Sequence, residues 1–220
     1  MSAVLKIDEL LLPDHYYLSS NDECFYHMEY AARMGYTHSD ANNLIHNFKK
    51  PTKYRGQGPW VHKQRAIRKI GNLYKTSLEG LIDLQEVTIV PVPPSKMKDH
   101  PEYDSRMADM INQWTHGKEC DVRELIRMRE SIDAVHEADD RLSPEELIEL
   151  MELDNSLTDG VHGQIVVMDD VLTTGAHFVA CKSILQEAFP HAHIRGVFIA
   201  RTIWIKPSAQ DDFAELPDEL

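Results

Sequence analysis

The chain has 220 residues, of which 42% are hydrophobic and 27% charged, as is typical of a globular protein with one large domain or a core with an appended subdomain. No apolar run approaches the roughly 18 residues that a membrane span needs, and the acidic first residues do not resemble a secretory signal, so we expect a cytoplasmic protein with no membrane partner. The three cysteines lie far apart, which excludes a structural zinc site of four cysteines and argues against a disulfide scaffold.

Charge is distributed unevenly along the chain. The formal net charge is −13, yet the segment 41–78 contains no acidic residue and nine basic ones, so the remainder carries 36 acidic against 14 basic residues (23 minus 9). This segment is either a solvated helix face or a local contact for a phosphorylated ligand. Four aromatic residues interleave with the basic ones, either as a stacking surface for a nucleic-acid partner or as contacts of a helix core: Phe48, Tyr54, Trp60 and Tyr74.

The first part of the chain is expected to be mostly helical. Residues 24–34 have the composition of a helix, and the two prolines and two glycines of 49–60 predict a loop. Apolar residues at helical spacing over 66–74 predict a further helix. We therefore expect residues 1–80 to form a mostly helical N-terminal segment.

The following region alternates between strand and helix patterns. The apolar, β-branched run 86–92 predicts a strand, and an apolar stripe at 107–114 predicts a helix with one buried face. Residues 121–128 are an ambiguous second strand. Before the next strand, Ser143 is expected to cap a helix in a capping box closed by Glu146.

A second strand–helix–strand unit follows. The run 163–170 predicts a strand buried on both faces, 181–188 carries the apolar stripe of a helix, and 193–201 predicts a last strand. Two such units in succession predict an α/β fold with a parallel sheet flanked by helices.

The sequence "VVMDDVLTTGA" (166–176) combines two acids with a short loop that suits a phosphate. A helix that starts after the strand offers free N–H groups and a positive dipole end, Thr173 and Thr174 add hydroxyls, and Gly175 lets the backbone approach closely. Asp169 and Asp170 would repel that phosphate on contact, so we expect them one sugar away, bound to a ribose diol or helping to hold a metal.

Three other interpretations of this stretch explain less. A Walker B strand needs a GxxxxGK[ST] loop, which the chain lacks. A phosphatase that forms an aspartyl phosphate needs a second Asp two residues after the first, where this chain has Val171. A helix-capping Asp explains one carboxylate but not both together with the Thr-Thr-Gly run.

The same stretch resembles the phosphoribosyl-pyrophosphate (PRPP) motif of type I phosphoribosyltransferases. The resemblance covers roughly residues 86–203, with "IVPVPPSK" at the place of the family's pyrophosphate loop. The order of parts is most similar to the competence-protein F branch, although the zinc module of that branch is missing. The resemblance implies a type I phosphoribosyltransferase-like core at 81–205, with a mobile hood at about 129–160, a helical N-terminal extension and an acidic tail at 206–220.

The resemblance also implies roles for individual residues. Asp169 and Asp170 would bind the ribose hydroxyls and contact Mg²⁺ indirectly through the ligand. The 5-phosphate would bind to the loop Leu172, Thr173, Thr174, Gly175 and Ala176, and pyrophosphate to Pro94, Ser95 and Lys96. Further candidates, each of which is otherwise a surface charge, are Arg106, Arg127, Arg129, His136, Arg141 and His177; the arginines are candidates because their planar fork matches phosphate oxygens.

The function implied is a Mg²⁺-dependent transferase that moves a 5-phosphoribosyl group from PRPP to an acceptor and releases pyrophosphate. The alternative is a non-catalytic protein on the same fold that senses PRPP or a nucleotide, or that is associated with a nucleic acid. No residue pattern identifies the acceptor. Relatives of this type often form dimers, so a homodimer is the implied assembly.

Overall fold

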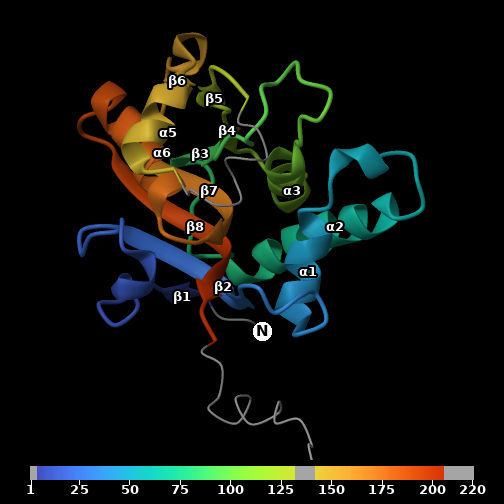
Figure 1. Ribbon diagram of the computed structural model, residues 1–220. Coiled ribbons are helices and arrows are strands. Elements are labelled where there is room, and N and C mark those ends of the chain that lie inside the picture. Colours follow the sequence, from blue (N-terminus) through green and yellow to red (C-terminus); the bar gives the residue numbers. More distant parts are fainter. Residues whose placement is uncertain (1–3, 132–141, 206–220) are drawn as a thin grey trace, which may run out of the picture.

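The computed structural model describes residues 4–131 and 142–205, and its centre is a six-stranded sheet with the order β1-β2-β8-β7-β3-β4 (Figure 1). All neighbouring strands are parallel except β1 and β2, which are antiparallel. The predicted α/β architecture, a mostly parallel sheet flanked by helices, is therefore confirmed. The strands are β1 (Leu5–Lys6), β2 (Glu23–Ala31), β3 (Val87–Pro91), β4 (Asp121–Val122), β7 (Gln164–Leu172) and β8 (His193–Ile203).

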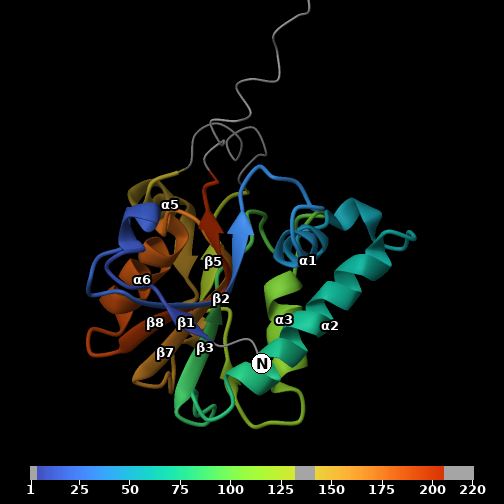
Figure 2. The same cartoon turned by 90° about the horizontal axis from the view of Figure 1, so that it is seen from below.

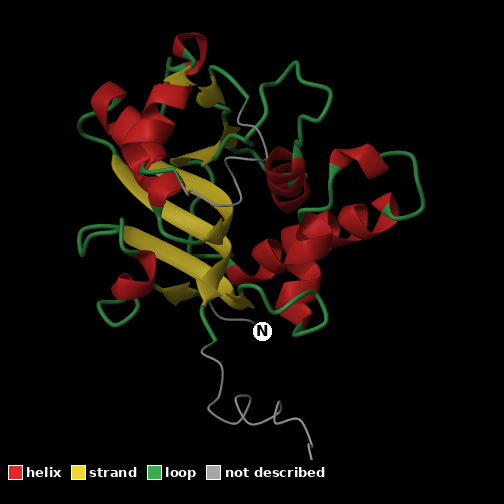
Figure 3. Ribbon diagram, in the orientation of Figure 1, coloured by secondary structure: helices red, strands yellow, loops and turns green. Residues whose placement is uncertain are grey.

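Helices cover both faces of this sheet, as two perpendicular views show (Figures 2 and 3). One face carries α1 (Asp40–Phe48), α2 (Trp60–Ser77) and α3 (Arg106–Thr115), and the other carries α5 (Pro144–Leu150) and α6 (Ala176–Ala188). A separate two-stranded sheet pairs β5 (Ile126–Met128) with β6 (Met151–Leu153). Short 3₁₀ turns lie at η1 (Leu12–His15), η2 (Thr52–Tyr54) and η3 (Asn155–Leu157).

The central strand β7 shows why the sheet needs both helical layers. Ile165 and Val167 belong to the apolar core on the α6 side, whereas Val166 and Met168 belong to the core on the α3 side. All four side chains are buried, as expected for a parallel strand that is covered on both faces. The continuous apolar run before the two aspartates therefore reflects a strand in the middle of a three-layer fold.

Several predicted helices are present at their expected places. The apolar stripe of α3 is fully covered, and the helix start at Ser143 has the complete capping box: the Ser143 hydroxyl accepts from Glu146 N–H, and the Glu146 carboxylate accepts from Ser143 N–H. Close packing of α2 on α3 requires Gly71, because a Cβ there would lie 2.6 Å from Gln113 Cγ.

Two of the predicted elements are corrected. The helix predicted at 24–34 is wrong, because most of this segment forms β2, which lies between β1 and β8 in the sheet. Cys24 and Tyr26 pack in one core and Phe25 against the other, so burial on both faces hides the alternation that usually marks a strand. The ambiguous segment 121–128 contributes two short strands, β4 and β5, to different sheets.

The strand order reverses between β3 and β7. From β3 the chain adds β4 on one side, then returns to the other side of β3 to add β7 and β8. In open α/β sheets, a crevice forms outside the carboxyl ends of the strands at such a reversal, and ligands bind there. The carboxyl ends of β3 and β7 are therefore the expected position of a ligand site.

No helix in the described part of the chain is long and apolar enough to cross a membrane.

Candidate functional site

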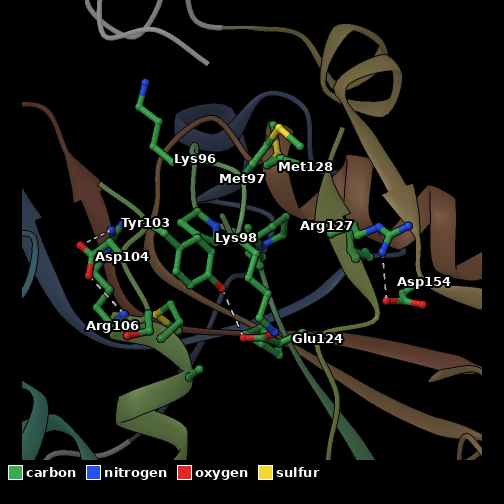
Figure 4. A pocket seen from close by; sticks show the side chains of 18 of the residues that line it. Lys96, Met97, Lys98, Tyr103, Asp104, Arg106, Glu124, Arg127, Met128 and Asp154 are labelled. Carbon is green, nitrogen blue, oxygen red and sulfur yellow. Dashed lines mark hydrogen bonds and ion pairs between the residues drawn. The ribbon is translucent and has the colours of Figure 1, made fainter. Parts of the chain in front are cut away.

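A cavity of about 420 Å³ lies at the carboxyl ends of β3 and β7 (Figure 4). Pro91 lines it at the end of β3 and Asp169 near the end of β7. Figure 4 shows Tyr103 of the loop between β3 and α3, and Arg106 at the start of α3, on one side of the cavity and Arg127 of β5 on the other. The cavity is therefore bounded by the switch point of the main sheet and by the small β5–β6 sheet.

Most charged side chains of the cavity are already paired with one another. Lys98 forms an ion pair with Glu124, and the Tyr103 hydroxyl donates to the same carboxylate at 3.3 Å. Burial, followed by the charge of Glu124, raises the pKa of Tyr103 to about 12. On the other side, Arg127 contacts Glu152 at 2.7 Å and Asp154 at 3.4 Å. A negatively charged ligand would therefore have to displace these carboxylates from the cations that they contact.

The two adjacent aspartates point in different directions and have different partners. Asp169 lines the cavity, and its Oδ1 accepts a hydrogen bond from the Asp170 backbone N–H at 2.7 Å. It forms no ion pair with any residue in the described ranges. Burial and the neighbouring negative charge of Asp170 raise the pKa of Asp169. Asp169 is thus a carboxylate at the cavity surface that no side chain in the described ranges neutralises by an ion pair.

Asp170 is a buried ion-pair partner. Its side chain receives two hydrogen bonds on Oδ2, from Arg106 Nε at 3.0 Å and Nη2 at 2.8 Å, and one on Oδ1 from Lys49 Nζ at 3.1 Å. Burial alone would raise the pKa of Asp170, but the positive charges of Lys49 and Arg106 outweigh it and hold the pKa well below its usual range. Both carboxylate oxygens are therefore occupied by cations of the protein itself.

Arg106 links this pair to a longer buried network. Its Nη1 donates to Asp104 Oδ2 at 2.9 Å, and Lys63 Nζ donates to the same oxygen at 2.7 Å. Lys63 is 1% exposed and also donates to the carbonyls of Phe48 and Lys50, each at 2.9 Å. Burial lowers the pKa of Lys63, and Asp104 partly offsets this effect. Two lysines of the basic segment, Lys49 and Lys63, thus form ion pairs with carboxylates of this network.

The loop predicted to hold a phosphate joins β7 to α6. Gly175 is the N-cap of α6 and has φ = 92°, a left-handed conformation that favours glycine. Thr174 is buried, and its hydroxyl accepts a hydrogen bond from Ala176 N–H at 3.4 Å. The predicted geometry of a strand that leads directly into a helix N-terminus is present, although Asp169 and Asp170 belong to the strand itself.

A segment near the N-terminus covers one side of this loop. His15 contacts the Thr173 carbonyl through Nδ1, and Tyr17 N–H donates to the Thr174 carbonyl at 3.0 Å. Leu18 packs against Gly175 so closely that a Cβ on the glycine would lie 2.9 Å from Leu18 Cγ. Burial lowers the pKa of His15, which is 0% exposed. Nothing in the sequence around position 15 indicates this contact with a loop about 160 residues away.

The structure brings together some of the predicted site residues and not others. Pro94, Lys96, Arg106 and Asp169 line the same cavity, as do Arg127 and Arg129. Its described lining includes neither Ser95 nor the loop Leu172–Ala176. Of the predicted hood, residues 142–160 form α5, β6 and η3, whereas 132–141, with His136 and Arg141, lie outside the described residues. His177 is exposed on α6.

The donor groups fit a metal ion only as a companion of a phosphorylated ligand. Among residues 4–131 and 142–205, no three His, Cys, Asp or Glu side chains gather as a metal site. Asp170 has both oxygens bound by cations, which leaves Asp169 as a ligand from the pair. Mg²⁺ commonly takes one or two carboxylates and completes its shell with waters and substrate phosphates. Asp169 suits that mode of binding.

Comparison with models of known protein families gives no match for this sequence, and neither does comparison with curated proteins. The function must therefore be inferred from the residues of the cavity, their charges and their position on the sheet.

Proposed function

We propose that this protein binds PRPP at the β3–β7 switch point on a type I phosphoribosyltransferase-like fold, and that it transfers the 5-phosphoribosyl group to an acceptor with release of pyrophosphate. The main support is Asp169, an unpaired carboxylate at a cavity of about 420 Å³, only a few residues before a helix N-terminus with glycine at its cap. A carboxylate that accepts from a diol and an N-terminus that binds an anion match the two ends of a ribose 5-phosphate.

Asp169 would accept hydrogen bonds from the ribose hydroxyls. Asp170 is reassigned in this proposal, because it is 3% exposed and both of its oxygens already accept hydrogen bonds from Lys49 and Arg106. The 5-phosphate would bind at the N-terminus of α6, where the helix dipole favours negative charge. Since Leu18 and His15 cover one side of the loop, the phosphate would approach from the side of Asp169.

Pyrophosphate would bind among the cations of the cavity. Lys96, Arg127 and Arg129 line it, and Arg129 is 58% exposed with only a 3.5 Å contact to Glu152. Arginine pairs well with phosphate oxygens because its planar fork can donate two parallel hydrogen bonds. Mg²⁺, when bound, would neutralise part of the pyrophosphate charge, with Asp169 as its protein contact.

The chemistry would be a displacement at C1 of the ribose. The C1–O bond to pyrophosphate breaks with its electron pair leaving on pyrophosphate, and a lone pair of the acceptor forms the new bond to C1. Positive charge develops on the ring in the transition state, near the carboxylate of Asp169. The protein contributes by holding the reactants in line and by stabilising the charge of the leaving group.

A sensor that binds PRPP or a nucleotide without turnover is the second candidate. The internal pairing of the cavity charges favours it, because Lys98, Arg106 and Arg127 each contact a carboxylate already. A cavity neutralised in this way can hold a ligand without being arranged to stabilise a departing pyrophosphate. Binding alone therefore does not distinguish the two candidates, and turnover does.

Titration calorimetry with PRPP and Mg²⁺ tests the binding step. We expect Asp169→Asn to weaken binding about tenfold to a hundredfold, as the loss of a charge-assisted hydrogen bond implies. Asp159→Asn is the matched control, since Asp159 is exposed and does not line the cavity. Absence of binding at millimolar PRPP would refute the transferase and any sensor of PRPP.

Pyrophosphate release, measured against a panel of nucleobases, ammonia and glutamine, tests the transfer step. Release that requires one acceptor identifies the enzyme and its acceptor together. Binding of PRPP without release for any member of the panel favours the sensor.

A further inference from the structure

The basic segment 41–78 leaves a group of unpaired cations on the surface. Two of its nine basic residues, Lys49 and Lys63, form ion pairs with Asp170 and Asp104. The other seven form no ion pair with any residue in the described part of the chain. They are Lys50, Lys53, Arg55, Arg65, Arg68, Lys69 and Lys75. Both views place the N-terminal end of α2 and the loop before it at the edge of the molecule (Figures 1 and 2).

Helix α2 presents part of this charge as a stripe. Ala66, Ile70 and Tyr74 face the core, whereas Arg65, Arg68 and Lys69 are exposed and Lys75 is partly exposed. Positions three or four apart share a helix face, so these cations follow one side of α2 for about 15 Å. The segment has no acidic residue of its own to neutralise them.

Two aromatic rings lie at the loop end of this stripe. Lys50 and Lys53 lie 5.9 Å and 5.5 Å from the centre of the Tyr54 ring, and Arg55 lies 5.5 Å from the centre of the Trp60 ring. Both rings are partly exposed. The other two aromatic residues that interleave with basic ones in the sequence, Phe48 and Tyr74, are fully buried and belong to the core.

We infer that this basic surface, defined as the seven unpaired cations with Tyr54 and Trp60, binds single-stranded nucleic acid. Cations that track a phosphate backbone, next to rings on which bases can stack, are the two components of such sites. Stacking on Tyr54 requires bases that are not paired, which selects single strands over a duplex. The inference is independent of PRPP binding, because none of these residues lines the cavity.

A membrane surface fits these observations less well. Basic helices that lie on membranes insert a row of large apolar side chains. Within 41–78, Val61 is the large aliphatic residue that the structure leaves exposed, at 37%. The two partly exposed rings are flanked by cations and not by aliphatic side chains, so this surface lacks the apolar row that insertion requires.

The rest of the protein restricts where a polyanion can bind. Outside the basic segment the chain carries 36 acidic and 14 basic residues, and this excess of negative charge repels a phosphate backbone. A nucleic acid should therefore bind at the basic surface and not spread over the molecule. Affinity should fall steeply with salt, since each neutralised phosphate releases a counterion.

Fluorescence anisotropy with labelled oligothymidylate and oligouridylate of about 20 nucleotides tests this inference on the full chain. We expect micromolar binding at about 50 mM salt. In the double variant Arg65→Gln with Lys69→Gln, the negative slope of log affinity against log salt should become shallower by about 1.4. Each lost phosphate contact on a single strand contributes about 0.7 to the magnitude of this slope. Lys6→Gln with Lys118→Gln, which removes two exposed cations elsewhere, should leave the slope unchanged.

Tyr54→Leu tests the stacking component, because it keeps apolar bulk and removes the ring. Affinity for single strands should fall roughly 5- to 100-fold. Circular dichroism of each variant checks that α2 is intact, which the good helix propensity of Gln supports.

Four outcomes would overturn the inference. They are no anisotropy change at low salt, an equal loss in the Lys6 and Lys118 control, unchanged affinity for Tyr54→Leu, and binding to vesicles of anionic phospholipid without binding to either oligonucleotide.

Discussion

Asp170→Asn tests whether the second aspartate stabilises the fold or serves the ligand. The residue is 3% exposed and accepts three hydrogen bonds from Arg106 and Lys49. Asparagine keeps the shape and one acceptor oxygen, but it removes the negative charge and turns an N–H₂ group toward one of the cations. Arg106 would then keep Asp104 as its remaining carboxylate. We therefore expect Asp170→Asn to destabilise the protein.

The magnitude follows from the burial of the pair. Removing one partner of a buried ion pair costs about 3–5 kcal/mol. Because Asn keeps an acceptor and Arg106 keeps Asp104, we expect a loss of about 2–4 kcal/mol in the free energy of unfolding. In a protein of this size each kcal/mol lowers Tm by about 2–4 °C, which corresponds to a decrease of roughly 5–15 °C at pH 7.

The effect should depend on pH with a definite sign. The folded-state pKa of Asp170 is lowered, so its stabilisation is present above the unfolded pKa of about 3.9 and is lost as the pH falls towards the folded value. Thermal unfolding of both proteins from pH 7 to pH 3 should show a gap in Tm that is widest at neutral pH. The gap should narrow below about pH 4.

Two cation variants serve as matched controls. The Lys49 side chain is 48% exposed, so Lys49→Gln should cost about 0–1 kcal/mol. Arg106 is 20% exposed and holds both Asp170 and Asp104, so Arg106→Gln should cost about 2–4 kcal/mol. An unchanged Tm for Asp170→Asn at pH 7, or equal costs for the two cation variants, would refute this account of the network.

Three further changes should separate the roles of neighbouring residues. Asp169→Asn should keep or slightly raise Tm at pH 7. Burial and the charge of Asp170 raise the pKa of Asp169, so the wild-type protein should gain stability as the pH falls through that pKa. The variant should lack this gain. Gly175→Ala should cost about 1–3 kcal/mol in urea unfolding, from its φ of 92° and the contact with Leu18. Because Leu18→Ala itself removes a buried side chain, the steric part should show as a smaller cost of Gly175→Ala in the Leu18→Ala background. Burial lowers the pKa of His15, so stability should fall as the pH drops below the unfolded pKa of about 6.5. In His15→Asn, the Tm measured by thermal unfolding should therefore depend less on pH between pH 7 and 5.

The elements that could be predicted from the sequence are those with a local signal. The apolar run of β7, the stripe of α3 and the capping box at Ser143 each depend on residues within a few positions, and each is present. The segment that forms β2 was predicted as a helix because its sequence does not alternate between apolar and polar residues. In the fold, β1 and β8 cover both edges of β2, and helices or turns cover its faces. Such burial depends on the complete fold and leaves no alternation in the segment itself.

The site was predictable only in part, for a related reason. The pattern of two acids, a hydroxyl pair and glycine correctly places acids beside a strand–helix turn. Which acid faces the cavity depends on the alternation of side chains along β7, and which one is neutralised depends on α1 and α3. Lys49 lies 121 positions from Asp170, so no local pattern connects them. The covering of the loop by His15 is equally remote in sequence.

The pairing of β2 with β8 has a consequence for how the chain folds during synthesis. Glu23 pairs with Arg195 and Ala31 with Ile203, so β2 is completed by β8, which follows it by 172 positions at the Glu23–Arg195 pair. Until residues 193–203 emerge, Cys24 and Tyr26 have no neighbouring strand on that side, and this apolar, unpaired edge is open to other chains. Closing a loop of this length is slow, since its entropy must be lost before any contact compensates. We therefore expect nascent chains of this protein to need protection from aggregation until β8 is released.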